Sequence, residues 1–196
     1  MSLTQNISIR SLQPEEIKVI YEKHMQHDFP ASELKPYSWI EKLWNNGCYK
    51  CYGFYGDTDE KLYAYAFTMA DDAGRMLLLD YFAACADVRG QGYGSQALAL
   101  LQEACGEWEG LIFEVEDDDS TDAAEEKEIR RRRIFFYERN HVQMTAERST
   151  AFGVDYKLMV LPLGNEKAGE QLGEKLAAIY RKMLPEQIYQ KSFRIR

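Results

Sequence analysis

The chain has 196 residues, which suits one domain with its own core, and its 45% hydrophobic and 29% charged residues are ordinary for a globular protein. Its net charge of -8 argues against a nucleic-acid partner, because a protein that neutralises phosphates needs an excess of Lys and Arg. No apolar run approaches the ~18–20 residues that span a bilayer, so we expect no membrane partner either.

The N-terminal part of the chain predicts one strand and two helices. Apolar and polar side chains alternate over residues 7–12, as in a short strand. Pro14, followed by two glutamates, opens a helix that we expect to run to about His27. Residues 38–44 predict a second, shorter helix.

An aromatic hairpin and a buried strand are expected next. Residues 48–55 and 61–69 are rich in aromatic side chains and flank a polar segment, which is typical of a hairpin. A turn is expected at residues 71–74. Residues 76–84 form a nearly continuous apolar run, which predicts a strand covered on both faces.

The following segment predicts a helix, a strand and a second helix. The first helix should run from about Tyr93 to Glu107, because its apolar residues recur at helical spacing. Residues 110–116 predict a strand, and a long charged helix should extend from Thr121 to about Asn140.

Two strands and a last helix complete the predicted order. Residues 143–146 and 155–163 should close the sheet, and Asn165 is a candidate cap for the last helix. That helix would place these apolar residues on one face: Leu172, Leu176, Ile179 and Met183. We therefore expect one domain at residues 1–163 and a helical extension, residues 164–196, packed on it.

This order of elements predicts an α/β (α+β) fold with a central, mixed and partly antiparallel sheet. The amphipathic last helix and the terminal residues 193–196 would also support a homodimer. Four cysteines offer only one C-x-x-C pair, at Cys48 and Cys51, without the second pair that a structural zinc site needs. We therefore expect no metal, reduced thiols and a cytoplasmic location.

The most informative segment follows the buried strand. Three glycines, Gly90, Gly92 and Gly94, precede or open a helix. Glycines allow backbone N–H groups to point inward with no Cβ in the way, and a helix N-terminus adds further donors and positive potential. With Arg89 as an additional cation, this turn predicts a pyrophosphate site.

Three interpretations of the glycine turn compete. The first is a tight turn that binds nothing, although three alternating glycines would then cost backbone entropy without a return in binding. The second is a dinucleotide site, for which Glu114 or Glu116 could bind the ribose, but Ser95 stands where the third glycine of G-x-G-x-x-G belongs. A P-loop is excluded because the G-K-[ST] sequence is missing.

The third interpretation rests on a family resemblance. The sequence from Arg89 to Gly94, R-G-Q-G-Y-G, resembles the R/Q-x-x-G-x-G/A acyl-CoA signature of the GNAT N-acetyltransferases. Asp80-Tyr-Phe-Ala-Ala84 is similar to their fourth strand, and the stretch from Arg133 to Asn140 is similar to their last core helix. The likeness covers about residues 7–163.

The resemblance implies a three-layer fold in which the fourth and fifth strands splay apart and acetyl-CoA lies between them. Its pantetheine arm would pair with the backbone of Phe82, Ala83 and Ala84. Its phosphates would be bound by a stretch that comprises Arg89, Gly90, Gln91, Gly92, Tyr93, Gly94 and Ser95.

Acyl transfer from a thioester to an amine needs a neutral amine and benefits from an acid at the leaving sulfur. Tyr137 is at the family position of that acid. Asp80 is on an apolar strand, where a carboxylate should be partnered or functional, and Glu114 is near the end of the next strand. We rank Glu114 above Asp80 as the base, with a structural ion pair as an equal alternative for either.

Two arginines depart from the family pattern. Arg130 and Arg133 stand where an Asn and an Ala are usual, on the same helical stripe as Tyr137. They would either reach the cofactor or balance nearby acids. An acidic run at residues 114–122 would then attract a cationic acceptor, unless it is only a solvated loop.

These observations predict an acetyltransferase that uses acetyl-CoA as co-substrate and a small-molecule or peptide primary amine as acceptor. Two alternatives from other classes remain. One is a CoA- or nucleotide-binding regulatory module without turnover, against which Tyr137 argues. The other is a nicotinamide-dependent oxidoreductase.

Overall fold

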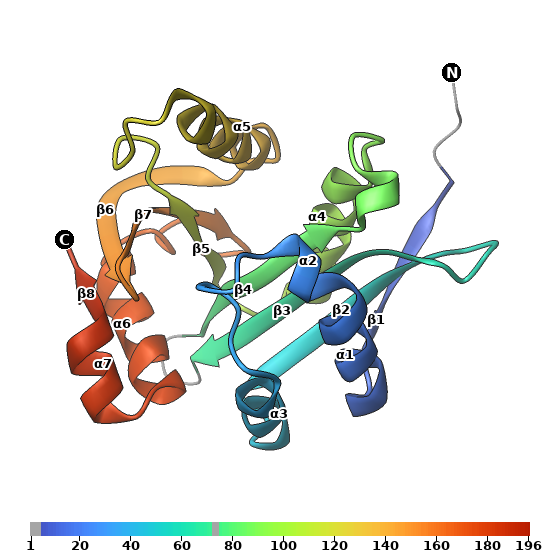
Figure 1. Cartoon of the computed structure of the whole chain (residues 1–196), viewed down its shortest axis with the longest axis horizontal. Helices are drawn as coiled ribbons and strands as arrows, with labels where there is room; N and C mark the ends of the chain where they lie inside the picture. Colours follow the sequence, from blue (N-terminus) through green and yellow to red (C-terminus); the bar gives the residue numbers. More distant parts are fainter. Residues whose placement is uncertain (1–4, 72–74) are drawn as a thin grey trace. The chain divides into compact units, whose positions relative to one another are not determined.

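A computed structural model describes residues 5–71 and 75–196, and it has the mixed α/β architecture that the sequence predicts (Figure 1). Eight strands belong to one mixed sheet. By the clustering of its internal contacts the chain divides into two compact units. The first unit takes the described residues up to Thr68 together with Asp80–Cys105, and the second takes the remaining described residues, to Arg196.

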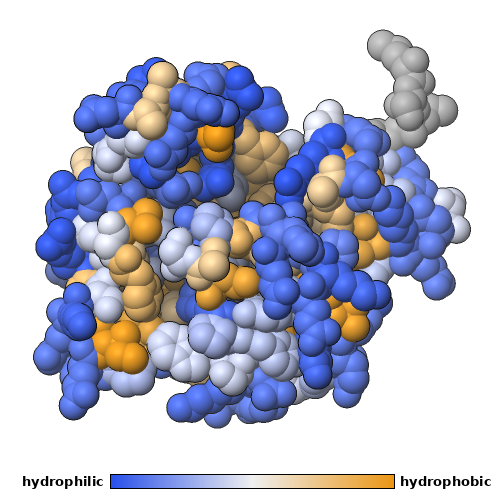
Figure 2. Space-filling model, in the orientation of Figure 1, coloured by the Kyte–Doolittle hydropathy of each residue, from blue (hydrophilic) through white to orange (hydrophobic). Residues whose placement is uncertain are grey.

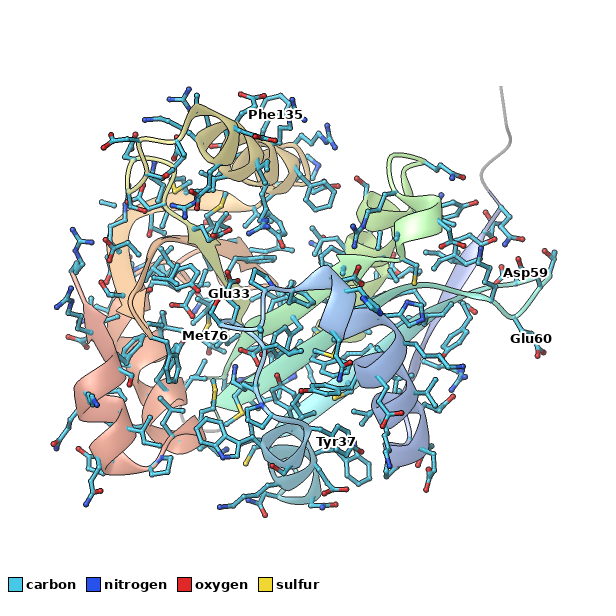
Figure 3. The ribbon with its side chains drawn as sticks, viewed as in Figure 1. Glu33, Tyr37, Asp59, Glu60, Met76 and Phe135 are labelled. Atoms are coloured by element: carbon cyan, nitrogen blue, oxygen red, sulfur yellow. The ribbon has the colours of Figure 1, made fainter. Side chains whose placement is uncertain are left out.

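The strands of the first unit lie in the order β1-β2-β3-β4. They are β1 (Ile7–Ser11), β2 (Tyr49–Gly56), most of β3 (Leu62–Asp71) and the second half of β4 (Met76–Ala84). β1 runs antiparallel to β2, with Ile7 opposite Gly56. Asp59 and Glu60 lie at the tip of the loop that joins β2 to β3, as Figure 3 shows. The predicted aromatic hairpin is therefore confirmed.

One helical run with an irregular turn follows β1. It consists of α1 (Pro14–Ile20), the π-helical turn η1 (Tyr21–Met25) and α2 (Gln26–Asp28), so it ends within a residue of the predicted His27. A capping box between Gln13 and Glu16 fixes its start. The second predicted helix is α3 (Tyr37–Asn45).

The second half of β4 leads into the glycine turn. A short 3₁₀ turn, η2 (Ala86–Val88), is followed by α4 (Tyr93–Ala104), which ends three residues before the predicted Glu107. The buried Tyr93 anchors the first turn of α4, because its ring lies 4.5 Å from that of Tyr63. Helix α4 therefore starts at a fixed point directly after Gly92.

The strands of the second unit lie in the order β4-β5-β7-β6-β8. They are the first half of β4, then β5 (Gly110–Glu116), β6 (Gln143–Ala151), β7 (Val154–Pro162) and β8 (Phe193–Ile195). β4 and β5 are parallel and their pairing ends at Leu78 and Ile112, although both strands continue. β5 also pairs along its whole length with the antiparallel β7, from Gly110 opposite Pro162 to Glu116 opposite Tyr156. The register described between β4 and β5 thus covers the first three residues of each strand.

Three helices complete the second unit: α5 (Ala124–Arg139), α6 (Leu172–Met183) and α7 (Glu186–Ser192). Figure 1 shows α5 on one side of β5, β6 and β7, with α6 and α7 on the other. Successive side chains of a strand point to opposite faces, so Phe113 of β5 meets α5 while Glu114 meets α6.

The C-terminal residues differ from the prediction in three ways. α6 begins at Leu172 rather than at Asn165, which instead accepts a hydrogen bond from the backbone N–H of Lys167. The carboxylate of Glu147 accepts from the N–H groups of Leu172 and Gly173, both at 2.8 Å, so the cap comes from β6. The segment also contains α7 and the strand β8, which pairs with a β6 that is longer than predicted. The turn predicted at residues 71–74 lies almost entirely outside the described residues.

Each unit has an apolar core. The largest fully buried side chains of the first unit are Leu12, Ile17, Met25, Ile40, Phe54, Tyr65 and Phe67. Those of the second unit are Met69, Met76, Leu77, Leu78 and Phe113. Burying one such side chain stabilises the fold by roughly 1.5–3 kcal/mol. On the face drawn in Figure 2, hydrophobic residues emerge as small patches among hydrophilic ones. Among the described residues, no helix combines the length and apolarity that crossing a membrane requires.

Candidate active site

The glycine turn has the backbone that a phosphate-binding loop requires. Gly90 has φ of +77° and Gly92 has φ of +92°, a left-handed region that side chains with a Cβ rarely adopt. A Cβ built on either glycine meets nothing within 4 Å, so the space beside both is open. Gly92 is also the N-cap of α4. Among the described residues, no side chain accepts a capping hydrogen bond from the N-terminus of this helix. The turn therefore presents backbone donors at an open helix N-terminus.

Arg89 links this turn to two other parts of the first unit. Its Nε donates to the carbonyl oxygen of Ala84 at 3.0 Å, and its guanidinium forms an ion pair with Asp28. The Asp28 side chain is 5% exposed and also accepts a hydrogen bond from Tyr65 at 2.8 Å. Half of the Arg89 side chain remains exposed. The arginine thus fixes the end of β4 and retains an accessible surface beside the glycines.

Asp80 has a cationic partner of its own. Lys35 donates from Nζ to both Asp80 oxygens, at 2.7 and 2.9 Å, and Tyr49 donates to the same carboxylate. The Lys35 and Asp80 side chains are 13% and 8% exposed, so the pair is largely buried. The Lys35 ammonium also lies 5.0 Å from the centre of the Tyr81 ring. Both oxygens of Asp80 are therefore occupied by contacts within the first unit.

Glu114 has different neighbours, in the second unit. Ser149 donates from Oγ to Oε1 at 2.6 Å, and Tyr180 donates from its hydroxyl to Oε2 at 2.7 Å. Ser149 and Tyr180 are buried, whereas Glu114 is half-buried. The carboxylate is therefore held by two hydroxyl groups, one on each oxygen.

Tyr137 lies on α5 with its ring against Phe113. The two ring centroids are 4.9 Å apart, and Phe136 contacts the tyrosine from the same helix. Burial raises the pKa of Tyr137 to about 12, although the nearby Arg133 acts to lower it. The phenol is therefore protonated at neutral pH, which is the form that can donate a proton.

Arg130 and Arg133 both bind Glu116. Arg133 donates to Glu116 at 2.5 Å, and Arg130 forms an ion pair with it at 3.5 Å. The buried Arg130 also donates to the carbonyl oxygen of Asp117 at 2.7 Å and to Ser120 at 2.8 Å. These contacts balance acids of the segment between β5 and α5, which is one of the two roles that the sequence left open.

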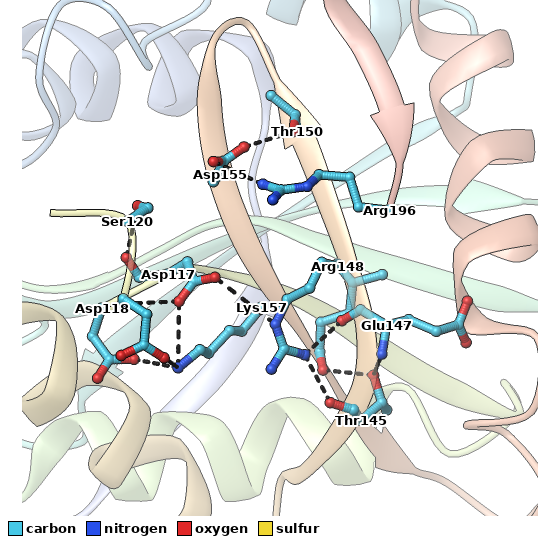
Figure 4. A network of polar contacts seen from close by, with 12 residues as sticks. Asp117, Asp118, Ser120, Thr145, Glu147, Arg148, Thr150, Asp155, Lys157 and Arg196 are labelled. Atoms are coloured by element: carbon cyan, nitrogen blue, oxygen red, sulfur yellow. Dashed lines mark hydrogen bonds and ion pairs between the residues drawn. The ribbon is translucent and has the colours of Figure 1, made fainter.

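The acidic run after β5 is paired within the chain. Lys157 forms ion pairs with Asp117 at 3.3 Å, Asp118 at 2.5 Å and Asp119 at 2.9 Å, as the network in Figure 4 shows in part. Arg131 adds a second cation to Asp118. These three aspartates are the one group among the described residues whose spacing could suit a metal, and the ammonium of Lys157 lies among them. Little of their charge is left to attract a cationic substrate.

A groove of about 530 Å³ lies beside α5 in the second unit. Phe135, which is 62% exposed and labelled in Figure 3, and Met144 are apolar residues of its lining. Its charged side chains are three basic and three acidic ones: Arg131, Arg132, Lys157, Asp118, Glu128 and Glu138. None of the predicted catalytic or cofactor residues lines this groove, so we do not assign it to the reaction.

The predicted site residues thus fall into two groups. Asp80, the backbone of residues 82–84 and the glycine turn belong to the first unit, while Glu114, Arg130, Arg133 and Tyr137 belong to the second. Ser149 and Tyr180 escaped the sequence analysis. One signal was present, because a tyrosine on the apolar face of a helix needs a hydrogen-bond partner.

Comparison with known proteins identifies one matching family. The acetyltransferase (GNAT) family matches residues 18–140, more than half of the chain. No curated protein matches the chain at a significant level.

Solved structures share the fold. The ribosomal-protein-S18-alanine N-acetyltransferase from Escherichia coli is 21% identical, with a TM-score of 0.56 over 81% of this chain and 94% of that one. A dodecameric spermidine N-acetyltransferase from Vibrio cholerae is 9% identical, with a TM-score of 0.60 over 85% of this chain and 97% of that one. A GNAT-family chain from Bacteroides thetaiotaomicron is 21% identical, with a TM-score of 0.66 over 87% of this chain and 96% of that one.

Proposed function

Because the chain belongs to the GNAT acetyltransferase family, we propose that it transfers the acetyl group of acetyl-CoA to a primary amine by direct attack. The observation that carries this proposal is the glycine turn. Gly90 and Gly92 hold left-handed backbone conformations in open space, directly before the N-terminus of α4. That arrangement suits the pyrophosphate of CoA, which accepts hydrogen bonds from backbone N–H groups.

The residues present fit the co-substrate. In this proposal the phosphates bind at residues 89–95, and the pantetheine arm pairs with the backbone of residues 82–84. Arg89 has exposed surface with which to approach a phosphate. Acetyl-CoA supplies the acetyl group as a reactive thioester. A side chain added at Gly90 or Gly92 would therefore weaken the binding of acetyl-CoA before it affects the chemistry.

Tyr137 is the acid in this mechanism. Its raised pKa, about 12, keeps a proton on the phenol oxygen at neutral pH, and that proton is donated to the leaving sulfur. The rings of Phe113 and Phe136 orient the phenol from two directions.

Glu114 is the base in this mechanism, in preference to Asp80. Asp80 is bound to the ammonium of Lys35 on both oxygens, so protonating it would break a largely buried ion pair. The bonds that Glu114 accepts from Ser149 and Tyr180 come from neutral hydroxyl groups, and losing one of them costs less than breaking a buried ion pair. It accepts the proton that the attacking amine loses, directly or through water.

The acceptor is a primary amine of a small cationic molecule or of a peptide. Two of the related structures are named for such acceptors, spermidine and the alanine of ribosomal protein S18. The net charge of -8 favours a cation at long range. Asp117, Asp118 and Asp119 add little, because Lys157 already binds them.

The direct test is an amine panel. Spermidine, spermine, lysine and a peptide with an N-terminal alanine are incubated with acetyl-CoA, and free thiol is followed with time. We expect release above the background hydrolysis rate with at least one amine, and a product heavier by one acetyl group in mass spectrometry. Thermal melting with acetyl-CoA or NAD separates the alternatives. Stabilisation by NAD alone would contradict the proposal.

A homodimer remains a proposal, testable by light scattering. The apolar face of α6 and the side chain of Phe193 are buried within the second unit, so they are not available for an interface without rearrangement.

A further inference from the structure

Glu114 is held by two side chains that come from elsewhere in the second unit. Ser149 is on β6 and is fully buried, and Tyr180 is on α6 with 5% of its surface exposed. Each donates to a different oxygen of the carboxylate, at 2.6 and 2.7 Å. Both lie outside residues 18–140, the range that the family matches.

Two donors on the two oxygens favour the charged form of a carboxylate. A proton on Glu114 would occupy one of the oxygens that now accept, so one hydroxyl would have to turn away or lose its bond. Hydrogen bonding to the ionised form favours that form. The charged form is also the one that can take a proton from an amine.

The hydroxyl of Tyr180 has little freedom to move. Its ring is stacked on that of Phe193, with centroids 3.9 Å apart and planes 17° from parallel. Phe193 opens β8, which pairs with β6, opposite Ala151. The start of α6 is fixed by the bonds from Leu172 and Gly173 to Glu147. Three separate contacts therefore fix the position from which Tyr180 donates.

Most charged groups on the elements around Glu114 have partners of their own. Glu116 on β5 binds Arg133, and Glu147 on β6 binds the start of α6. The others and their partners are Arg148 with the Thr145 carbonyl, Asp155 with Arg196, Lys157 with Asp118, Lys175 with the Ala168 carbonyl, Arg181 with the Tyr189 ring and Lys182 with the Ala70 carbonyl. Tyr156 on β7 and Glu174 on α6 complete the ionisable groups of these elements. Any of these charges can influence the protonation of Glu114 at a distance. Removing the hydroxyl of Ser149 or Tyr180 leaves all of these charges in place, so their influence is the same in the variant and the wild type.

We propose that Ser149 and Tyr180 are positioning residues that keep Glu114 ionised and oriented as the proton acceptor. The C-terminal segment, residues 172–196, then contributes to catalysis by positioning the base. This inference rests on the proposed function. As the amine nitrogen bonds to the acetyl carbon, its proton moves to Glu114, the carbon–sulfur bond breaks, and the sulfur keeps that electron pair and takes the proton of Tyr137.

The test compares Tyr180→Phe and Ser149→Ala with the wild type on one amine, so that the ionisation of the amine itself cancels. Each variant loses one donor, and Tyr180→Phe keeps the ring stacked on Phe193. We expect the acid limb of kcat/KM to move to higher pH by about one unit in each variant, since a hydrogen bond to a charged group contributes roughly that much. The KM for acetyl-CoA should not change. Ser149→Thr, which keeps a hydroxyl, should restore the wild-type profile.

Tyr189→Phe is the matched control. Tyr189 also contacts Phe193, with ring centroids 5.6 Å apart, but it is not placed against Glu114. Its variant should keep the wild-type acid limb. A readout without turnover is the infrared band of the protonated Glu114 carboxyl, identified by its loss in Glu114→Gln. That band should appear at higher pH in Tyr180→Phe than in the wild type.

The outcomes separate the two proposals. If the wild type acetylates an amine but both variants keep its acid limb and its infrared titration, the positioning role is overturned and the proposed function stands. If the wild type neither binds acetyl-CoA in calorimetry nor releases thiol, both are overturned. Should Tyr180→Phe fail to fold by circular dichroism, Ser149→Ala decides alone.

Discussion

The ring of Tyr137 on α5 packs on the ring of Phe113 on β5, with centroids 4.9 Å apart and planes inclined by 58°. The contact holds the phenol by its apolar part. Its hydroxyl makes no hydrogen bond within residues 5–71 and 75–196, whereas Tyr65 and Tyr180 each donate to a carboxylate. A tyrosine oriented by its ring alone keeps its proton available for another acceptor.

Replacing Tyr137 by Phe should lower kcat by about 10²–10⁴-fold, the usual contribution of a positioned acid. The affinity for acetyl-CoA, measured by calorimetry, should stay within a factor of two or so because the ring remains. Tyr55→Phe, in the first unit, serves as the control and should behave as the wild type. A loss of only a few-fold with intact stability would reduce Tyr137 to a packing residue.

The raised pKa of Tyr137 predicts where its ionisation appears. Burial favours the neutral phenol, so the proton should be lost near pH 12 rather than near the ordinary value of about 10. The phenolate absorbance of the wild type minus that of Tyr137→Phe should therefore stay flat between pH 9 and 11. A titration step of that difference near pH 10 would show that the phenol is solvated and that burial does not control its proton.

Gly92→Ala should weaken acetyl-CoA binding strongly. The substitution places a Cβ on a residue with φ of +92°, which costs roughly 1–2 kcal/mol of backbone strain, and puts that Cβ into the open space before α4. Calorimetry should show at least a ten-fold weaker affinity, and Gly92→Val should abolish binding.

Gly47→Ala is the matched control for this strain. Gly47 has φ of +72° and no atom within 4 Å of a Cβ, but it lies in the loop after α3. Both alanine variants should therefore lose similar stability in urea, and only Gly92→Ala should lose affinity. Equal affinities in the two variants would place the phosphates elsewhere.

Substituting Asp80 should mainly lower stability, whereas substituting Glu114 should mainly lower kcat. Asp80→Asn leaves the largely buried ammonium of Lys35 without its counter-charge, which should cost about 3 kcal/mol of unfolding free energy while kcat changes by only a few-fold. Glu114→Gln keeps an acceptor for one hydroxyl and should lower kcat by about 10²-fold or more with a smaller loss of stability. The reverse pattern would make Asp80 the base.

The stability that Lys157 contributes should depend on pH. Burial acts to raise the pKa of Asp118, but hydrogen bonds from Lys157 and Arg131 outweigh it and hold that pKa below its ordinary value. A lowered carboxylate pKa contributes stability above the unfolded value of about 3.9, and that contribution is lost as the pH falls through the folded value.

Lys157→Met should therefore cost about 2–3 kcal/mol at pH 7, and the difference from the wild type should narrow below about pH 4. Lys127→Met is the comparison, because Lys127 pairs with the exposed Asp119 at 3.5 Å, and its loss should change stability far less than the loss of Lys157. Urea unfolding between pH 3 and 7 measures both. A cost for Lys157→Met that stays constant between pH 3 and 7 would contradict the ion-pair explanation.

Elements with a strong local signal could be predicted from the sequence. Gly110–Glu116 and Met76–Ala84 are the observed bounds of β5 and β4, because each apolar run is delimited by glycine or charge. Pro14 marked the start of α1 for an equally local reason. The glycine turn was predictable because glycine spacing specifies backbone geometry directly, and Gly90 and Gly92 have the positive φ that this requires.

Other features depend on contacts between distant residues and could not be predicted. The π turn at Tyr21–Met25 adds one residue to a helical turn without any local sequence signal. β8 is three residues long and exists because β6 offers it a partner. The bonds that Ser149 and Tyr180 make to Glu114 join positions 35 and 66 residues apart. No spacing rule brings such residues together.

The cap on α6 has a consequence for how this chain can vary. Gln171, the residue at the natural N-cap position, adopts φ of +53° and makes no side-chain cap, because Glu147 supplies the acceptor from β6. Gly173 leaves room for that carboxylate, since a Cβ there would lie 2.5 Å from its Oε2. Substitutions at positions 147, 171 and 173 should therefore depend on one another. A lineage that loses the glutamate should acquire Asp, Asn or Ser at 171, and only such a lineage should tolerate a larger side chain at 173.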